Sequence, residues 1–199
     1  AYGYNAFRID ITPYIQFGKS NLIEVHLNNV EESSRWYPGG GIYRPVSVEL
    51  YGNENFSTWD TFVRTLMASK DEAELEVNAL LQGKLGKGGK TVVTLSDKEG
   101  KKVAEQTIGG AAPEIKTTLK VQNPQLWSPE TPYLYKVTLT RYEGKKIADV
   151  QTLKTGIRTI AVSKENGFQL NGVTRKIKGV CLHHDLGPLG AAENKAALI

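Results

Sequence analysis

Residues 167–190 read GFQLNGVTRKIKGVCLHHDLGPLG, and the organisation of the whole chain is decided around this stretch. Asn171-Gly172 can occupy the two positive-φ positions of a tight turn. The flanking residues 167–170 and 174–180 carry apolar and β-branched side chains, as expected of strands. We therefore predict a short hairpin whose second strand continues as a buried strand.

The predicted strand leads to three polar side chains, His183, His184 and Asp185. A parallel α/β barrel gathers its reactive groups at the carboxyl ends of its strands, and imidazole and carboxylate groups are typical of such a rim. A helix-like pattern follows at residues 193–199. This order predicts that the last part of the chain contains the first strand of a larger barrel domain.

Upstream of the hairpin, strand-like segments alternate with turn signals rich in glycine and charged residues. Seven short strands over about a hundred residues are what an immunoglobulin-like β-sandwich requires. We predict these strands at residues 57–66, 72–82, 90–96, 103–108, 114–121, 134–141 and 145–155.

The core of this sandwich must depend on packing, because the only cysteine, Cys181, has no partner for a disulfide. Val180 and Leu182 flank that cysteine, which predicts a buried and unreactive thiol. Trp59 and Trp127 are the natural large side chains for the core.

Trp127 lies in a proline-rich segment, residues 123–133, which we call the corner. Its three prolines exclude a helix and favour an extended path before the next strand. A tryptophan in such a place can either pack into the corner or present a platform for a sugar ring. We favour packing, because the sandwich has no other large apolar side chain to hold this part together.

Before the sandwich, residues 7–11, 21–28 and 42–50 alternate apolar and polar side chains with a period of two, the pattern of half-buried strands. Unpaired strand edges and exposed apolar faces are templates for other chains. We therefore expect these strands to pack against the sandwich. For the same reason we expect the strand at residues 174–180 to pair with the sandwich edge or with a neighbouring molecule.

The composition narrows the classes of partner. Of the 199 residues, 40% are hydrophobic and 23% charged, which is ordinary for a folded domain. The formal net charge is +4, but the lysines are scattered among glycines without an aromatic pattern, which argues against nucleic acid. No apolar run is long enough to span a bilayer, which argues against a membrane partner.

Five segments, in this order, resemble glycoside hydrolase family 2, the group that contains β-galactosidases, β-glucuronidases and β-mannosidases. Residues 4–12 and 34–46 are similar to the end of the family's N-terminal jelly-roll domain. Residues 126–135 are similar to the late corner of its immunoglobulin-like domain. Residues 156–160 and 168–172 are similar to its passage into the catalytic barrel.

The resemblance implies an all-β fold class. An immunoglobulin-like β-sandwich would have part of a jelly-roll domain before it and the first strand of a (β/α)8 barrel after it. We place the jelly-roll part at residues 1–53, the sandwich at residues 54–157 and the truncated start of the barrel at residues 158–199. The polar residues 52–55 agree with the first boundary.

The family pattern Gly-Val-Asn-Arg-His-Glu-Asp falls on residues 179–185. It implies that His183 contacts the substrate sugar and that Asp185 is a nearby carboxylate. His184 is a further substrate-binding candidate, although it stands where the family has glutamate. Asn5 lies roughly where some members place a polar residue near the barrel mouth.

Cys181 and Leu182 stand in place of the commoner Asn-Arg, which leaves the sugar preference open. Retaining hydrolysis requires two carboxyl groups about 5 to 5.5 Å apart. The resemblance implies that both are glutamates on later barrel strands and assigns neither to this chain. We therefore expect no catalytic residue here and no activity from this fragment alone.

The first hypothesis is an internal fragment of a retaining glycosidase that hydrolyses terminal β-glycosidic bonds. Its parent protein would act on a carbohydrate substrate. The interpretation leaves open whether that protein forms homo-oligomers and whether it binds a mono- or divalent cation. A periplasmic or secreted location in a bacterium is compatible with it. The alternative is a non-enzymatic carbohydrate-binding or adhesive sandwich. A finished binding module is not expected to end within a helix pattern after His-His-Asp, which favours the enzyme.

Overall fold

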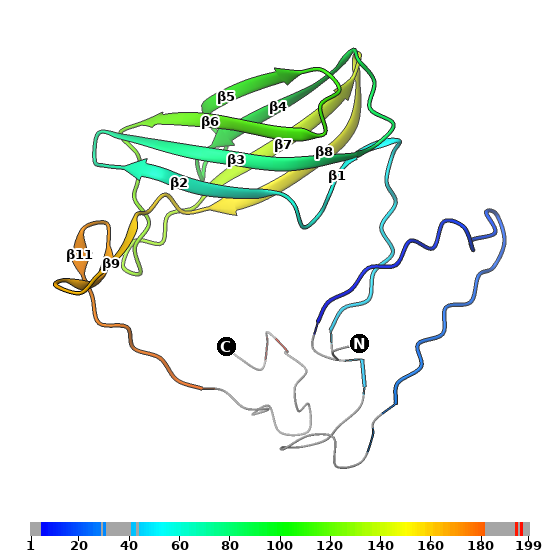
Figure 1. Cartoon of the computed structure of the whole chain (residues 1–199), viewed down its shortest axis with the longest axis horizontal. Helices are drawn as coiled ribbons and strands as arrows, with labels where there is room; N and C mark the ends of the chain where they lie inside the picture. Colours follow the sequence, from blue (N-terminus) through cyan, green and yellow to red (C-terminus); the bar gives the residue numbers. More distant parts are fainter. Residues whose placement is uncertain are drawn as a thin grey trace. The chain divides into compact units, whose positions relative to one another are not determined.

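The computed structural model describes residues 5–28, 30, 41–42, 44–181, 194 and 196. All eleven strands of these described residues lie between Glu54 and Thr174. They belong to one compact unit, Val48–Cys181 (Figure 1). The strands form two sheets of four strands and one sheet of three, and every pairing is antiparallel.

The first sheet is organised around its longest strand, β3 (Glu72–Gly83). β2 (Phe62–Ala68) and β6 (Glu114–Gln122) pair with β3, and the short β1 (Glu54–Phe56) pairs with its last three residues. The strand predicted at residues 57–66 is therefore displaced, because a turn follows β1 and delays the start of β2 to Phe62. Alternate side chains of β3 are buried, as the period of two predicts: Leu75, Val77, Ala79 and Leu81.

The second sheet has the strand order β5 (Lys102–Gly109), β4 (Gly89–Ser96), β7 (Tyr135–Glu143) and β8 (Lys146–Thr155). Figure 1 shows it stacked on the first sheet. Apolar side chains from both sheets form one buried cluster, which includes Leu75, Val77, Leu119, Val93, Leu95, Val137 and Leu139. The predicted immunoglobulin-like β-sandwich is confirmed.

Phe56 and Tyr135 are the buried aromatic side chains of this core. Trp59, predicted as a core residue, is 62% exposed, so that prediction is wrong. Trp59 lies in the turn between β1 and β2, whereas Phe56, the last residue of β1, is buried. Trp127 is half-buried and packs at the corner, outside the central cluster.

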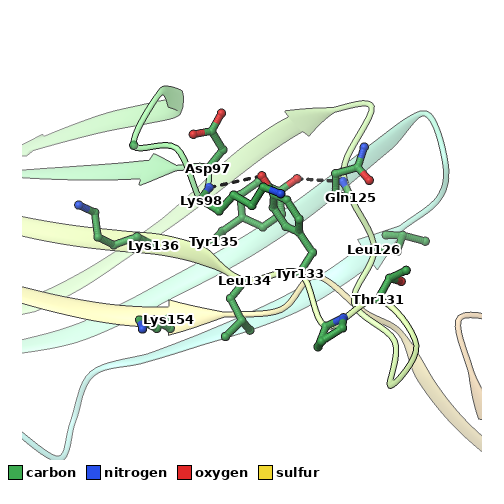
Figure 2. Close-up of a pocket in the computed structure, with 12 residues that line it drawn as sticks. Asp97, Lys98, Gln125, Leu126, Thr131, Tyr133, Leu134, Tyr135, Lys136 and Lys154 are labelled. Carbon is green, nitrogen blue, oxygen red and sulfur yellow. Dashed lines mark hydrogen bonds between the residues drawn. The ribbon is translucent and has the colours of Figure 1, made fainter.

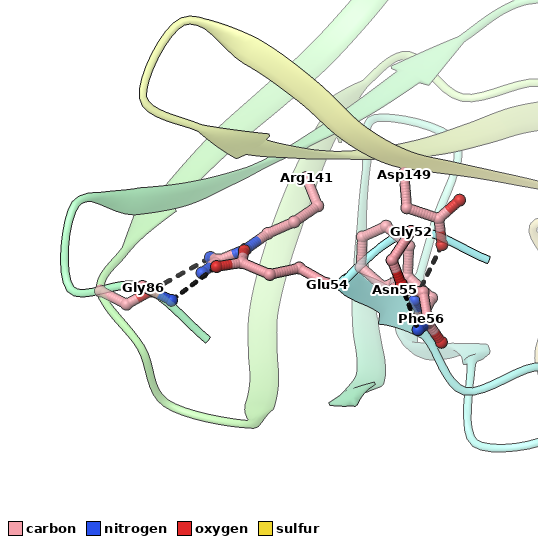
Figure 3. Close-up of polar contacts among 8 residues, drawn as sticks. Gly52, Glu54, Asn55, Phe56, Gly86, Arg141 and Asp149 are labelled. Atoms are coloured by element: carbon pink, nitrogen blue, oxygen red, sulfur yellow. Dashed lines mark hydrogen bonds and ion pairs between the residues drawn. The ribbon is translucent and has the colours of Figure 1, made fainter. Parts of the chain in front are cut away.

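A buried ion pair joins the two sheets through Glu54 on β1 and Arg141 on β7. Both side chains are at most 1% exposed, and Arg141 Nε donates to Glu54 Oε2 over 2.6 Å (Figure 3). The backbone N–H of Gly86 donates to the other carboxylate oxygen. Burial by itself would raise the pKa of Glu54, but the hydrogen bonds from Gly86 and Arg141 hold that pKa below its usual value. The carboxylate therefore stays charged opposite the guanidinium.

Backbone surrounds this pair closely. Arg141 Nη1 donates to the carbonyl oxygen of Gly110 over 3.1 Å, and a Cβ atom on Gly89 would lie only 2.1 Å from Nη2. β1 has a second contact with the second sheet, because the N–H of Phe56 donates to Asp149 Oδ2 on β8 over 2.8 Å (Figure 3). The three-residue β1 thus pairs with one sheet through its backbone and with the other through polar contacts.

The third sheet consists of β9 (Ile160–Ser163), β10 (Gly167–Leu170) and β11 (Val173–Thr174). Asn171 and Gly172 connect β10 to β11 with φ values of 51° and 75°. These are the positive values that a tight two-residue hairpin turn requires. The predicted turn is confirmed.

The predicted continuation of this hairpin to residue 180 is wrong. β11 ends at Thr174, residues 175–180 form no strand, and Ile177 and Val180 are 77% and 97% exposed. No strand among the described residues pairs with this segment, and an extended segment without a partner gains little from β-propensity. The expected pairing with the sandwich edge is absent, and Cys181, predicted to be buried, is exposed.

The strands predicted at residues 7–11, 21–28 and 42–50 are not formed in the described residues of those ranges. Their apolar side chains are exposed instead: Phe7 by 73%, Ile23 by 59% and Val48 by 59%. The expectation that these strands pack against the sandwich stays a prediction. Alternation marks which side chains can share a face, but a strand also needs a neighbour to bond with.

Gly89→Ala should destabilise the sandwich, because the added methyl group would overlap the guanidinium of Arg141. We expect the free energy of unfolding to fall by about 1 to 3 kcal/mol, as for other overpacked sites, measured by urea denaturation. Gly88→Ala is the matched control, since a Cβ atom there meets nothing within 4 Å. Equal losses in the two variants would show that the close approach of Gly89 to Arg141 is unimportant.

Candidate functional site

Of the residues predicted to bind substrate, His183, His184 and Asp185 lie outside the described residues and stay predictions. Asn5 is described; its side chain is exposed and it belongs to no strand. The structure therefore gives no distances among these four residues. It does show how the hairpin that precedes His183, His184 and Asp185 in the chain is attached to the sandwich.

Asn171 ties the hairpin turn to the corner with both ends of its side chain. Its Oδ1 accepts a hydrogen bond from the backbone N–H of Thr159 over 2.9 Å, and its Nδ2 donates to the carbonyl oxygen of Trp127 over 3.0 Å. Its backbone N–H donates to the carbonyl oxygen of Thr159 over 2.9 Å. The sequence predicts Asn171 as a turn residue, but it does not predict that its side chain bonds the hairpin to the sandwich.

Trp127 packs against the segment between β8 and β9. Its backbone N–H donates to the carbonyl oxygen of Ile157 over 2.8 Å, and a Cβ atom on Gly156 would lie 2.7 Å from the indole ring. The guanidinium carbon of Arg158 lies 5.0 Å from a ring centroid, within the range of a cation–π contact. The predicted packed corner is confirmed.

An ion pair between Glu130 and Arg175 forms a further link. Arg175 follows β11, and its Nη1 and Nη2 lie 2.6 and 3.0 Å from the two carboxylate oxygens of Glu130. The side-chain hydrogen bonds from Arg175 lower the pKa of Glu130 from 4.5 to about 2. The backbone N–H of Arg175 donates to the carbonyl oxygen of Phe168 over 2.9 Å. Sequence reasoning missed this pair, because its partners are 45 residues apart and neither follows a periodic pattern.

These contacts set the point at which the chain leaves the sandwich. Up to Arg175 the backbone is bonded to the hairpin or to the corner, whereas residues 176–181 have no secondary structure and are exposed. The corner therefore acts as an attachment point for the segment that carries the predicted substrate-binding residues.

An open groove of about 710 Å³ lies beside the corner (Figure 2). Its walls come from the turn between β4 and β5, from the corner, and from the neighbouring ends of β7 and β8. Its principal lining side chains are Asp97, Lys98, Tyr133, Leu134, Lys136 and Lys154. Sequence reasoning did not single out this groove, since its lysines are far apart in the chain.

Within the described ranges, no three His, Cys, Asp or Glu side chains gather closely enough to hold a metal ion. Nor does any helix in those ranges combine the length and the hydropathy of a membrane span.

A family profile, curated relatives and a solved structure all match this chain. The profile of the family described as "Glycosyl hydrolases family 2" matches residues 57–158. The chain is 39% identical to the β-galactosidase BoGH2A of Bacteroides ovatus over 99% of this chain and 24% of that relative. It is 31% identical to a β-glucuronidase of Formosa agariphila over 89% of this chain and 21% of that relative.

A solved structure agrees with these matches. A glycosyl hydrolase family 2 member from Bacteroides cellulosilyticus is 42% identical, with a TM-score of 0.87, over 96% of this chain and 27% of that one. The chain thus spans about a quarter of the length of the relatives that it matches.

Acidification should weaken the attachment of the hairpin at Arg175, while the hydrogen bonds of Asn171 to the corner persist. Because the pKa of Glu130 is lowered from 4.5 to about 2, the ion pair contributes fully above about pH 4.5 and is lost as the pH falls through about 2. We expect the protection of the Arg175 amide against hydrogen exchange to fall over this interval, while that of Val137 in the core persists longer. Glu130→Gln should show low Arg175 protection already at pH 6; a pH profile unchanged by that substitution would show that the ion pair does not hold the hairpin.

Proposed function

Because the chain belongs to glycosyl hydrolase family 2, we propose that it supplies the accessory sandwich and the start of the catalytic barrel of a retaining glycosidase. The observation that carries this proposal is the family match over residues 57–158, which coincides with the folded sandwich. Relatives named as a β-galactosidase and a β-glucuronidase support a substrate with a terminal β-linked sugar. The activity is proposed for a longer protein that contains this chain.

The domain limits are part of the same proposal. Residues 1–53 would belong to a jelly-roll domain, residues 54–157 to the sandwich, and residues 158–199 to the start of the barrel. The confirmed hairpin at β10 and β11 supports a change of architecture after the sandwich, since it forms a separate three-stranded sheet.

The chemistry requires two carboxyl groups, one that protonates the leaving oxygen and one that attacks the anomeric carbon. We assign neither to this chain. Its proposed contribution is positional: His183 would donate or accept a hydrogen bond at a sugar hydroxyl, and Asp185 would lie nearby, with His184 and Asn5 as further candidates. Hydrogen bonds that strengthen in the transition state lower the barrier, but they do so only when the two carboxyl groups are present.

The corner supports this role through its attachment of the hairpin. A displacement of about 1 Å in a catalytic group can lower a rate by a large factor, so a strand that carries sugar-binding residues needs a fixed origin. Asn171, Trp127 and the pair Glu130–Arg175 provide that origin on the sandwich side. The choice between a galactoside and a glucuronide would depend on pocket contacts from the remaining barrel loops.

The purified 199-residue chain should hydrolyse neither p-nitrophenyl β-D-galactoside nor p-nitrophenyl β-D-glucuronide, because it is proposed to lack both carboxyl groups. The longer natural protein should hydrolyse at least one of them, and His183→Ala should lower its kcat/KM by a larger factor than a change at exposed Lys145. The measurement is nitrophenolate release. A longer protein that binds sugars but hydrolyses no β-glycoside would support the binding-module alternative and contradict the proposal.

A further inference from the structure

We propose that the groove beside the corner is a binding site for acidic oligosaccharides, in which lysines contact sugar carboxylates and Tyr133 contacts a sugar ring. The choice of a sugar as the ligand rests on the proposed function, while the charge and shape of the groove rest on the structure alone. The site would let the sandwich itself recognise the polymer that the longer protein degrades.

The first observation is a pair of opposed like charges. Lys136 on β7 and Lys154 on β8 are direct partners in the antiparallel register, and both side chains are exposed at the groove. Like charges directly opposite on neighbouring strands destabilise a sheet. On its other side Lys136 is opposite Ser96, which offers no compensating charge. Within the described part of the chain, neither ammonium group has a carboxylate oxygen within 4.0 Å.

The remaining charged side chains of the groove keep its balance positive. Lys98 adds a third ammonium group, which lies 5.5 Å from the centroid of the Tyr133 ring. Asp97 is the acidic lining residue, but its Oδ1 accepts a hydrogen bond from the backbone N–H of Lys101 over 2.7 Å as part of the turn. Lys98 Nζ is itself 3.6 Å from Glu99 Oε1, so among the described residues the positive charge of the groove that has no carboxylate partner is that of Lys136 and Lys154. Such an arrangement selects an anionic ligand.

The second observation is a fixed aromatic wall. Tyr133 meets Tyr135 edge to face, with ring centroids 4.9 Å apart and an interplanar angle of 60°. Tyr133 Oη accepts from the backbone N–H of Lys98 over 3.3 Å, and Tyr135 Oη accepts from that of Gln125 over 2.8 Å (Figure 2). Leu134, 41% exposed, adds apolar surface. The wall is therefore ordered before a ligand arrives, which lowers the entropic cost of binding.

These features together favour a carboxylated sugar over other anions. The C–H face of a pyranose can pack on a single aromatic ring, and its carboxylate can reach the opposed lysines. A single-stranded nucleic acid would need several stacking rings, whereas Tyr135 is 4% exposed and Tyr133, which is half-buried beside Lys98, is the other aromatic ring that lines this groove. A neutral sugar would leave Lys136 and Lys154 opposed without a counter-charge.

The test is isothermal titration calorimetry of the 199-residue chain with a β-linked trisaccharide that contains glucuronic acid, at low and at high salt. We expect saturable binding that weakens with salt, and little heat from a neutral galactose trisaccharide. Lys136→Gln with Lys154→Gln should weaken binding about tenfold, which lies within the range for the loss of two exposed ion pairs. Tyr133→Leu should weaken binding at both salt concentrations, because it removes the ring contact.

The matched control is Lys145→Gln with Lys146→Gln, which removes the same charge at the far end of the β7–β8 hairpin. It should change the dissociation constant by less than about twofold, and both double variants should keep the melting temperature within about 4 °C. Absence of binding, equal losses in the two double variants, or equal affinity for a hexaglutamate peptide would each overturn the proposal. Hydrolysis by the longer protein with no binding at the groove would refute this site alone, whereas binding without hydrolysis would refute the proposed function alone.

Discussion

The sandwich depends on a buried ion pair between Glu54 and Arg141, which lie on different sheets. Taking two charges out of water costs several kcal/mol per ion, so such a pair is tolerated only where its geometry is close and the remaining polar atoms are satisfied. Here Gly86 and Gly110 provide a backbone donor and a backbone acceptor, although Arg141 Nη2 is buried without a hydrogen-bond partner. The pair therefore constrains two strands and two loops at once, which makes it a determinant of how the sheets are aligned.

The same strand, β7, connects this ion pair to the functional region. Arg141 lies near its end, and Tyr135, at its beginning, contacts Tyr133 and the corner. From the corner, Trp127 and Glu130 hold the hairpin from which the chain departs, through their contacts with Asn171 and Arg175. The position of that departure is thus set by packing and hydrogen bonds that are continuous with the core.

Much of the sandwich could be predicted from the sequence, because alternation in β3 and β7 coincides with burial and glycine-rich turns separate the strands. The Asn171-Gly172 turn could be predicted for the same reason, since its conformation depends on local sterics. Alternation failed at Phe7 and Ile177, where no strand among the described residues pairs with the segment. The pair Glu130–Arg175 and the opposed lysines of the groove could not be predicted, because they depend on register between distant segments.

The most direct measurement of the central claim is a double-mutant cycle of Glu54→Leu and Arg141→Met, followed by urea denaturation. If the pair aligns the sheets, each single variant should lose about 3 to 5 kcal/mol of unfolding free energy, because it leaves a buried charge without its partner. The double variant should lose clearly less than the sum of the two. Additive losses below about 1 kcal/mol each, as for an exposed pair such as Lys102 with Glu105, would contradict the account.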